Sequence, residues 1–560
     1  MKTKAFIFYF LVAVIFGCKP NQKDQFGSNI TKDPKEIEQG NASFEQLCSS
    51  CHSFKQRGIG PNLSGITRTV EKDWIKEFVR DPRKMADKKD SRTTKLIEDY
   101  KIFMPGFPNL TDIELNAIIG YLHTFEAPPL TDSDSSTSIK NPIIDTIGSS
   151  GILAELTLVT QVPVTKNGPP LARINKMECE KVSGRLFIND LRGYLYELKD
   201  DKALPYMSMR DVNDKFIDEP GLATGFGSFA FHPDFMNNGL LYTSHTEPSD
   251  SKLADFSYDG SVKVTVQWVV KEWKTNNPGS ASFSGSGREL MRVNFVGGIH
   301  GMQEISFNPT IKKGNPDYGK LYIGLGDGGS VENGFSEIAD HGGASVWSSI
   351  LRIDPLGRNS ENGQYGIPND NPFVGIPNKR QELWAYGFRN PNRLVWDDLG
   401  ELWATDIGQA NIEELNKVVP GMFYGWPIRE GTFLIDPKGD LAKAYPLPPN
   451  DEEYAVNYPF LQYDHDEGSA IIGGYFVKHG MFKGKYVFGD IVTGRLFVSN
   501  LFEAGPPKIE EWNIRYENKE VNLRDLVGGS RVDLRFGKDC NNNMYIFTKA
   551  DGKIYKIKDW

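Results

Sequence analysis

The segment Cys48-Ser49-Ser50-Cys51-His52 constrains this chain more than any other part of its sequence. Two thiols separated by two residues and followed at once by an imidazole form the C-x-x-C-H pattern of covalent haem attachment. The thiols can bond the edge of a porphyrin, and His52 can then ligate its iron. A thiol redox pair has similar spacing, so the surrounding sequence must separate the two interpretations.

The sequence on both sides of the motif favours haem. Gly40 and Phe44 precede it on a predicted short helix, and Gly60-Pro61-Asn62-Leu63 follows it. An amphipathic helix is predicted at about 112–125. Together with the motif, these features make residues 38–128 resemble a class I cytochrome c.

This resemblance implies a second axial ligand to the iron. Met104, within Phe103-Met104-Pro105-Gly106-Phe107-Pro108, is the expected thioether. It implies one haem c, held covalently by Cys48 and Cys51 and ligated by His52 and Met104. The alternative is a buried core methionine beside an unrelated thiol pair.

The N-terminus has the pattern of a targeting segment. Two lysines precede an apolar run at 5–16 that is too short to span a bilayer, and Cys18 follows Gly17. We expect a lipoprotein signal peptide over 1–17, a lipid on Cys18 and a polar tether over 18–37. An ordinary signal peptide cut nearby is the alternative. The protein is therefore predicted to be an exported, periplasm-facing lipoprotein, anchored in the outer membrane.

Composition predicts a turn-rich, largely β remainder. The chain has 56 Gly and 33 Pro in 560 residues, and its net charge of −9 gives no indication of a nucleic-acid partner. A Ser-, Thr- and Asp-rich stretch predicts a flexible linker over 129–151.

One pattern recurs six times in the remainder of the chain, residues 152–560. A Gly or Asn turn precedes a short strand that carries Leu, Tyr, Phe or Trp. The copies begin at Gly184, Gly239, Gly319, Gly400, Gly484 and Asn542. Such turn-plus-strand units predict an all-β six-bladed propeller, following a small all-α domain. A pair of β-sandwiches is the alternative.

Several segments of the predicted propeller carry a family resemblance. They are Gly225–Phe235, Leu321–Gly329, Leu351–Pro355, Ala385–Pro391, Ile407–Glu414 and Tyr424–Pro427. Together they resemble the glucose/sorbosone dehydrogenase family, which includes PQQ-dependent sugar dehydrogenases.

The resemblance implies a set of site residues. His300 matches the family's catalytic base, although a structural loop histidine is the alternative. The residues implied for PQQ are Arg389, Asn390 and Arg531. The residues implied for calcium are Gly408, Gln409 and Glu413. His465 is either a pocket residue or a surface residue.

Four positions depart from the family pattern. Val492, Ala223, Ile299 and Asp533 stand where family members carry a lysine, a glutamine, an acid and an arginine at the cofactor site. PQQ binding therefore does not follow from the resemblance alone, because a fold does not imply a function.

The expected function combines both domains. The sequence predicts an exported PQQ-dependent, aldose-type sugar dehydrogenase that passes electrons from PQQ to its own haem and on to a respiratory cytochrome or oxidase. The alternative is a haem-containing binding or sensing lipoprotein whose propeller has lost quinone chemistry. A propeller hydrolase is a third possibility.

Cys179 and Cys540 have no assigned role. Cys179 lies shortly before the first strand motif, and Cys540 lies just before the sixth. We expect two separate buried thiols, because equivalent turns on adjacent blades are often too far apart for a bridge. A disulfide across the seam between the first and last blades is the alternative.

Overall fold

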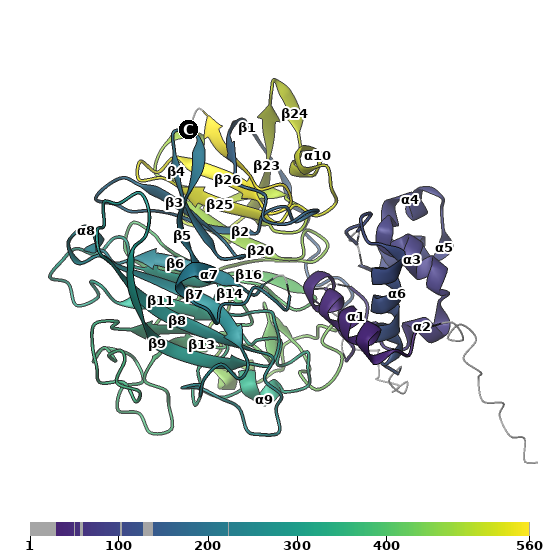
Figure 1. Cartoon of the computed structure of the whole chain (residues 1–560), viewed down its shortest axis with the longest axis horizontal. Helices are drawn as coiled ribbons and strands as arrows, with labels where there is room; N and C mark the ends of the chain where they lie inside the picture. The colour runs from purple at the N-terminus through teal and green to yellow at the C-terminus, as the bar shows by residue number, and fades with distance from the viewer. Residues whose placement is uncertain are drawn as a thin grey trace, which may run out of the picture.

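The computed structural model describes residues 30–49, 51–55, 60–100, 104–126, 138–221 and 223–558. A helical domain (30–126) precedes a larger β domain (138–558), as Figure 1 shows. The predicted signal peptide 1–17, the lipidation residue Cys18 and most of the tether 18–37 lie outside the described residues. No helix in the described part is both long and apolar enough to cross a membrane.

The described residues of the small domain form six helices. They are α1 (Pro34–Leu47), α2 (Ile66–Thr69), α3 (Lys72–Arg80), α4 (Pro82–Asp87), α5 (Ser91–Tyr100) and α6 (Asp112–His123). The Asp33 side chain accepts from the Lys35 N–H and caps the start of α1. At the start of α6, Thr111 and Glu114 form a capping box.

Helices α1 and α6 cross closely at Gly40. A Cβ added to Gly40 would lie 1.9 Å from the carbonyl oxygen of Ala117, so only glycine allows this approach. Phe44 is buried one turn further along α1 against Ile118 and Leu122 of α6. The short helix predicted at Gly40 and Phe44 is therefore confirmed as α1, and these two residues pack it against α6.

The β domain contains four separate four-stranded antiparallel sheets. The first sheet contains β2 (Ile174–Cys179), β3 (Leu186–Asp190), β4 (Tyr194–Lys199) and β5 (Lys202–Ser208), and the second contains β6 (Phe226–Phe231), β7 (Leu240–Pro248), β8 (Val266–Thr275) and β9 (Gly285–Phe295). The third sheet contains β10 (Glu304–Phe307), β11 (Leu321–Leu325), β12 (Ser349–Ile353) and β13 (Leu383–Tyr386). The fourth contains β14 (Pro391–Trp396), β15 (Leu402–Asp406), β16 (Ile412–Val418) and β19 (Leu461–Asp464).

A fifth, nine-stranded sheet completes the domain. It contains β20 (Ile471–Phe476), β21 (Tyr486–Asp490), β22 (Leu496–Ser499), β23 (Ile509–Tyr516), β24 (Lys519–Val521), β1 (Gly148–Gln161), β27 (Lys553–Lys558), β26 (Met544–Thr548) and β25 (Leu534–Lys538). Strand β1 joins its two halves by pairing parallel to β23 and antiparallel to β27. The N-terminal strand of the domain thus binds to its C-terminal strand.

Short elements occupy the connections. They are α7 (Met209–Val212), α8 (Phe235–Asn238), α9 (Ser336–Ala339), α10 (Leu523–Val527), the two-stranded β17 (Arg429–Glu430) and β18 (Phe433–Leu434), and the 3-10 helices at Asp451–Tyr454 and Gly480–Phe482.

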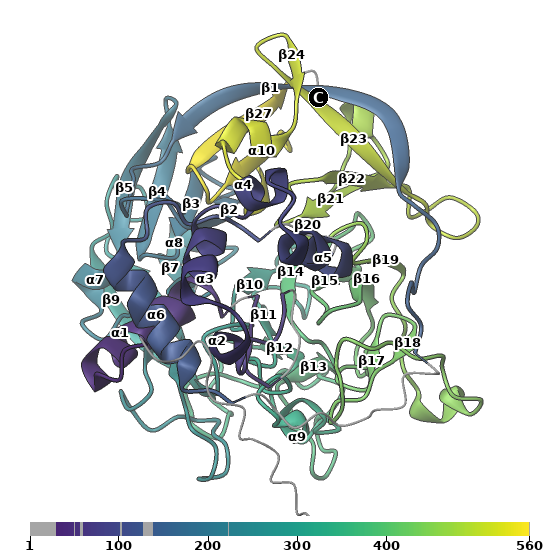
Figure 2. The same cartoon turned by 90° about the vertical axis from the view of Figure 1, so that its right-hand side faces the viewer.

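The sheets are arranged around a common centre. Strands β2, β6, β10, β14, β20 and β25 pack against one another in sequence, and β25 returns to β2. Figure 2 labels four of them, β2, β10, β14 and β20, around the middle of the β domain. Hydrophobic clusters fill the space between neighbouring sheets. The architecture is propeller-like, but the prediction of six separate blades is not confirmed, because β1 hydrogen-bonds the last strands into one sheet.

The linker prediction needs a correction at its C-terminal end. Residues 138–151, predicted as flexible, lie against the β domain: Ile139 bridges Ala444, and the Ile143 N–H donates to Asp464 Oδ2 at 3.0 Å. Strand β1 begins at Gly148. Backbone pairing with distant strands orders this stretch, and its local composition does not reveal such pairing.

Cys179 and Cys540 form a disulfide, so the expectation of separate thiols was wrong. Their Cα atoms lie 5.5 Å apart. Cys179 ends β2 and Cys540 follows β25, and these two strands pack side by side. The bridge therefore crosses the seam where the first sheet meets the last.

Candidate active site and haem cavity

An apolar cavity of about 210 Å³ in the helical domain brings the four predicted haem residues together. Cys48, Cys51, His52 and Met104 all line it. Much of the remaining wall is aromatic or aliphatic, including Phe44, Leu63, Trp74, Phe78, Ile97, Phe107 and Ile118. Two thiols, an imidazole and a thioether around one apolar cavity fit a covalently attached haem.

The imidazole of His52 is held by its neighbours. Its Nδ1 lies 2.9 Å from the carbonyl oxygen of Pro61, which can only accept, so Nε2 is left to ligate a metal. Burial lowers the pKa of His52 despite this hydrogen bond, which favours the neutral form that ligates iron. A Cβ on Gly60 would lie 2.4 Å from His52 Cε1, so glycine is needed beside the ring.

The helical domain lies on the face of the β domain, over its centre (Figure 2). Gln46 donates to Glu219 Oε1 at 2.9 Å and accepts from Lys166 Nζ at 2.8 Å. On another side of the contact, Lys55 donates to the carbonyl oxygen of Asn333. The contact is polar at these points, as interfaces between domains of one chain often are.

A second cavity, of about 120 Å³, lies in the β domain beneath the helical domain. Cys51, Val492 and Arg531 line both this central cavity and the haem cavity. Arg531 Nη1 lies 3.5 Å from Cys51 Sγ, and its Nε donates to Asp533 Oδ1 at 2.8 Å. A haem thioether at Cys51 would therefore lie at the wall of the central cavity.

His300 lines the central cavity in the loop between β9 and β10. Its Nδ1 is 2.7 Å from Oδ1 of Asp327, which follows β11. A carboxylate only accepts, so Nδ1 donates and Nε2 is the available acceptor. His300 has a φ of 49°, a conformation that non-glycine residues rarely adopt and that is often retained at functional sites.

Asp327 is fully buried and bound by further donors. The Gly329 N–H donates to Oδ1 at 2.8 Å, and Trp426 Nε1 donates to Oδ2 at 3.2 Å. Burial alone would raise the pKa of Asp327. The charges of His300 and Arg389 and the hydrogen bonds outweigh burial, so its pKa lies below the ordinary value. The carboxylate is thus held ionised beneath the histidine.

Arg389 and Asn390 line the same cavity, as predicted. Arg389 donates to Glu332 Oε1 at 2.5 Å, to Gln409 Oε1 at 3.0 Å and to the Gly408 carbonyl oxygen at 2.7 Å. Asn390 Oδ1 is buried and has no hydrogen-bond donor among the described residues. A buried acceptor without a donor is a group that a bound ligand can satisfy.

The residues predicted to bind calcium do not fit that ion as arranged. Gly408 and Gln409 line the cavity, and their backbone carbonyl oxygens are the predicted ligands. The Gly408 carbonyl oxygen accepts from Arg389, as does the side-chain Oε1 of Gln409. Glu413 does not line it; its carboxylate bonds His465 Nε2 at 2.9 Å and the Ile471 N–H at 2.7 Å. Within the described ranges, no group of three or more His, Cys, Asp or Glu side chains could hold a metal.

His465 is therefore a partner of a buried carboxylate and not a cavity residue. Burial alone would lower its pKa, but the Glu413 hydrogen bond and charge raise it above the ordinary value. His465 therefore matches neither interpretation that the sequence left open, because it is largely buried and bonded to Glu413 outside the cavity.

The four departures from the family pattern all reach the central cavity. Ala223, Ile299, Val492 and Asp533 line it. Sequence reasoning also missed polar residues that line the cavity, namely Arg173, Glu332, Arg535 and Lys549. No motif marks these four residues, since they are scattered along the sequence and meet only when the ring closes.

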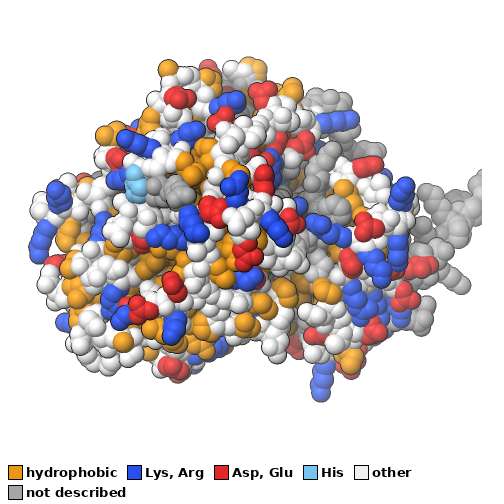
Figure 3. All heavy atoms as spheres, turned by 90° about the horizontal axis from the view of Figure 1, so that it is seen from above, with side chains coloured by type: hydrophobic (Ala, Val, Ile, Leu, Met, Phe, Trp, Pro, Cys, Tyr) orange, Lys and Arg blue, Asp and Glu red, His pale blue; other side chains and the backbone are white. Residues whose placement is uncertain are grey.

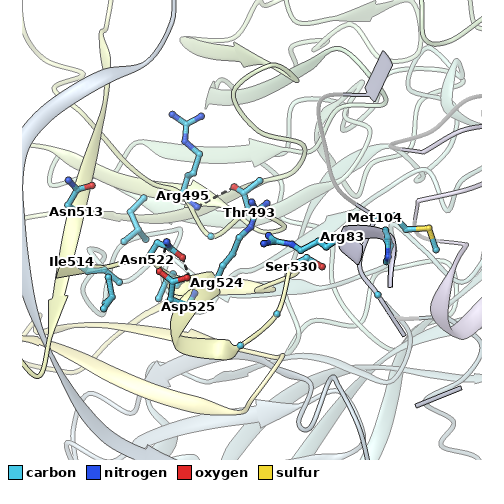
Figure 4. A pocket seen from close by; sticks show the side chains of 18 of the residues that line it. Arg83, Met104, Thr493, Arg495, Asn513, Ile514, Asn522, Arg524, Asp525 and Ser530 are labelled. Atoms are coloured by element: carbon cyan, nitrogen blue, oxygen red, sulfur yellow. Dashed lines mark hydrogen bonds between the residues drawn. The ribbon is translucent and has the colours of Figure 1, made fainter. Parts of the chain in front are cut away.

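A cleft of about 850 Å³ separates α4 from the β22–β24 and α10 region. Met104 lines both this cleft and the haem cavity, and Figure 4 shows Arg83 between Met104 and Ser530, with the sulfur of Met104 directed away from both. In the view of Figure 3, basic and acidic side chains are interspersed over the surface and form no broad region of one sign. The haem cavity thus has one side toward the central cavity and another toward this cleft.

Comparison with known proteins supports both domains. A family model described as Glucose / Sorbosone dehydrogenase matches residues 179–555, and one described as Cytochrome c matches residues 37–126. The predicted order of a cytochrome c domain and a propeller-like domain is therefore confirmed.

Individual relatives are distant. The HIPL2 protein of Arabidopsis thaliana is 28% identical over 413 residues, covering 64% of this chain and 56% of the relative. Quinoprotein glucose dehydrogenase B of Acinetobacter calcoaceticus is 25% identical over 222 residues, covering 36% and 40%. The chain spans about half the length of the curated relatives it matches. A solved structure of a glucose dehydrogenase has a TM-score of 0.51 at 19% identity, covering 72% of this chain and 99% of that chain, which shows a shared fold.

Proposed function

The chain belongs to the glucose/sorbosone dehydrogenase family, and on that premise we propose that it is an exported PQQ-dependent, aldose-type sugar dehydrogenase with its own haem acceptor. One observation carries the proposal. The central cavity and the haem cavity share Cys51, Val492 and Arg531 in their walls. An electron carrier attached at the wall of a cofactor cavity can receive electrons without a diffusing partner.

His300 is the proposed general base. Asp327 holds its Nδ1–H, so Nε2 can take the proton of a sugar hydroxyl placed in the cavity. PQQ, when bound, accepts the hydride from the carbon that carries this hydroxyl. The ionised Asp327 stabilises the imidazolium that forms as the proton arrives.

Cationic residues of the chain are the proposed cofactor ligands. Arg389 and Arg531 present guanidinium groups to the cavity, which suit carboxylates and a reduced quinone oxygen. Asn390 Oδ1 offers a buried acceptor to a ligand donor. These residues fit an anionic, hydrogen-bonding cofactor.

Further parts of the proposal concern architecture and location. We infer six blades, with the nine-stranded sheet comprising two blades joined by β1. The signal peptide and the lipid on Cys18 would place the protein at the periplasmic side of a membrane. A respiratory cytochrome or oxidase would then collect electrons at the cleft beside Met104.

The test uses the full chain with haem attached. PQQ is added with a panel of aldoses, and the haem absorption band is followed after rapid mixing. We expect haem reduction at a rate that is independent of protein concentration, because transfer occurs within one chain. His300→Ala should slow reduction roughly 10²–10⁴-fold without changing the haem spectrum. His479→Ala, outside both cavities, is the control.

Two results would contradict the proposal. If the haem of the PQQ-loaded protein stays oxidised with every aldose, the protein is not an aldose dehydrogenase. A rate proportional to protein concentration would show that electrons travel between chains.

One observation favours a second function, a haem-containing binding or sensing lipoprotein. Two of the predicted calcium ligands, the Gly408 carbonyl oxygen and the Glu413 carboxylate, already accept from protein donors, and Glu413 does not line the cavity. This function predicts saccharide binding that leaves the haem oxidised even when PQQ is present. The rapid-mixing experiment separates the two functions.

A further inference from the structure

Three buried cations line the central cavity outside the positions implied by the family resemblance. Arg173 lies directly before β2, Arg535 lies on β25, and Lys549 follows β26. Their exposed fractions are 2%, 6% and 6%. They reach the cavity from two neighbouring sheets, the first and the last around the ring.

The hydrogen-bond partners of these cations are mostly neutral. Arg173 donates to the backbone carbonyl oxygens of Gly221 and Thr224 at 3.2 and 2.6 Å. Arg535 donates to Asn175 Oδ1 at 3.1 Å and to its neighbour's carbonyl. In the part of the chain that the structure describes, the Lys549 ammonium group makes no hydrogen bond or ion pair.

The carboxylate of Asp533 shares the cavity with Lys549, but its Oδ1 accepts from Arg531 at 2.8 Å. Burial lowers the pKa of Lys549 well below its ordinary value, and the charges of Arg535, Arg173 and Arg393 lower it further, while Asp533 acts in the opposite direction. A buried cation without a partner destabilises a fold, and such exceptions concentrate at functional sites.

We propose that Arg173, Arg535 and Lys549 form a carboxylate-binding end of the central cavity, which takes a ligand bearing two or more carboxylates. The identity of that ligand rests on the proposed function, which makes it the carboxylate-rich quinone PQQ. The three cations then supply the positive charge missing at Val492 and Asp533, where family members carry a lysine and an arginine. In this chain the positive charge of the cavity comes from other segments of the ring.

The test measures binding and stability in the full, haem-containing chain without added sugar. PQQ, citrate and inorganic phosphate are titrated separately by calorimetry, and thermal unfolding is recorded with and without each. Lys549→Met is the main variant, because Met keeps the apolar stem and removes the charge. Lys538→Met is the matched control, since Lys538 is also a lysine whose pKa burial lowers, on β25, but it does not line the cavity.

We expect Lys549→Met to weaken PQQ and citrate binding at least tenfold and to raise the melting temperature of the ligand-free protein. Lys538→Met should leave both affinities within about twofold. At pH 8–9, wild type should take up protons as PQQ binds, because the ligand's charge restores the protonated Lys549. Calorimetry in two buffers of different ionisation enthalpy measures this uptake, and the Lys549 variant should lack most of it.

Different results overturn different claims. Unchanged PQQ affinity and proton uptake in Lys549→Met would overturn the carboxylate site while leaving the dehydrogenase proposal intact. Citrate binding that depends on Lys549, without any PQQ binding, would support the site and overturn the PQQ assignment. Phosphate binding as tight as citrate binding, or no stabilisation of wild type by any of the three, would overturn the inference.

Discussion

Replacing Asp327 with asparagine should separate catalysis from binding. The carboxylate is fully buried and bonds His300 Nδ1 at 2.7 Å, a hydrogen bond that gains a full opposite charge when the imidazole takes a proton. Hydrogen bonds to charged groups contribute about 1.5–3 kcal/mol. Asp327→Asn should lose this roughly 1.5–3 kcal/mol of stabilisation in the transition state but not in the substrate complex. The rate of sugar-dependent haem reduction should then fall roughly 10- to 150-fold.

The assay is single-turnover haem reduction in the PQQ-loaded protein at saturating aldose. Asp397→Asn is a matched control: Asp397 is also buried, accepts from the backbone N–H groups of Leu399 and Glu401 at 2.9 Å, and accepts from Trp403 Nε1 at 3.1 Å. It does not line the cavity. We expect the control to lose stability but to keep its rate, because its carboxylate supports a turn only.

The pH dependence of unfolding supplies an independent check. The lowered pKa of Asp327 means that its contribution to stability is complete above its ordinary pKa of about 4 and is lost as pH falls through the lower folded value. The stability difference between wild type and Asp327→Asn should therefore narrow under acid conditions. An Asp327→Asn protein that folds and reduces its haem at the wild-type rate would refute the assigned role.

Three further predictions concern the haem and the disulfide. Gly60→Ala should displace the His52 ring, which lies 2.4 Å from the new Cβ, and give a haem without normal His ligation in its absorption spectrum; an unchanged spectrum would contradict this. Met104→Ala should leave haem attached, as mass spectrometry would show, but lower its reduction potential in a redox titration, whereas an unchanged potential would exclude the thioether as ligand. The disulfide closes a loop with a sequence separation of 361 residues, for which the chain-entropy model gives about 5–6 kcal/mol. Cys179→Ser should lower the free energy of unfolding by about 2–5 kcal/mol in guanidinium titrations; alkylation of both Cys179 and Cys540 in unreduced wild type would show that no bridge forms.

Local chemistry made the haem domain predictable. The motif at 48–52 predicts which side chains bond the porphyrin and its iron. At Gly40 and Gly60 the neighbouring atoms leave no room for a Cβ. These contacts depend on short helices and turns, so a sequence pattern describes them well. Met104 was predicted from the family resemblance, as the second axial ligand, and it lines the same cavity as His52.

The strand pattern of the β domain was predictable to a similar degree. The six turn-plus-strand copies correspond to β3, β7, β11, β15, β21 and β26, which are each paired on both sides in their sheets. The pairing of β1 with β23 and β27 was not predictable, because it joins segments several hundred residues apart. The same long-range closure brings Cys179 to Cys540 and orders residues 138–151.

The charge of the central cavity shows a limit of reasoning from matched positions. Val492 and Asp533, matched to family positions that carry a lysine and an arginine, both line the central cavity, and each looks like a lost cation. Matching this sequence to the family motif one position at a time shows where a motif cation is replaced. It does not show a cation that reaches the cavity from a segment outside the motif. Only the closed ring shows that Arg173, Arg535 and Lys549 reach the same space. The net charge offered to a ligand is a property of the cavity, so substitutions at motif positions cannot by themselves decide whether an anionic cofactor binds.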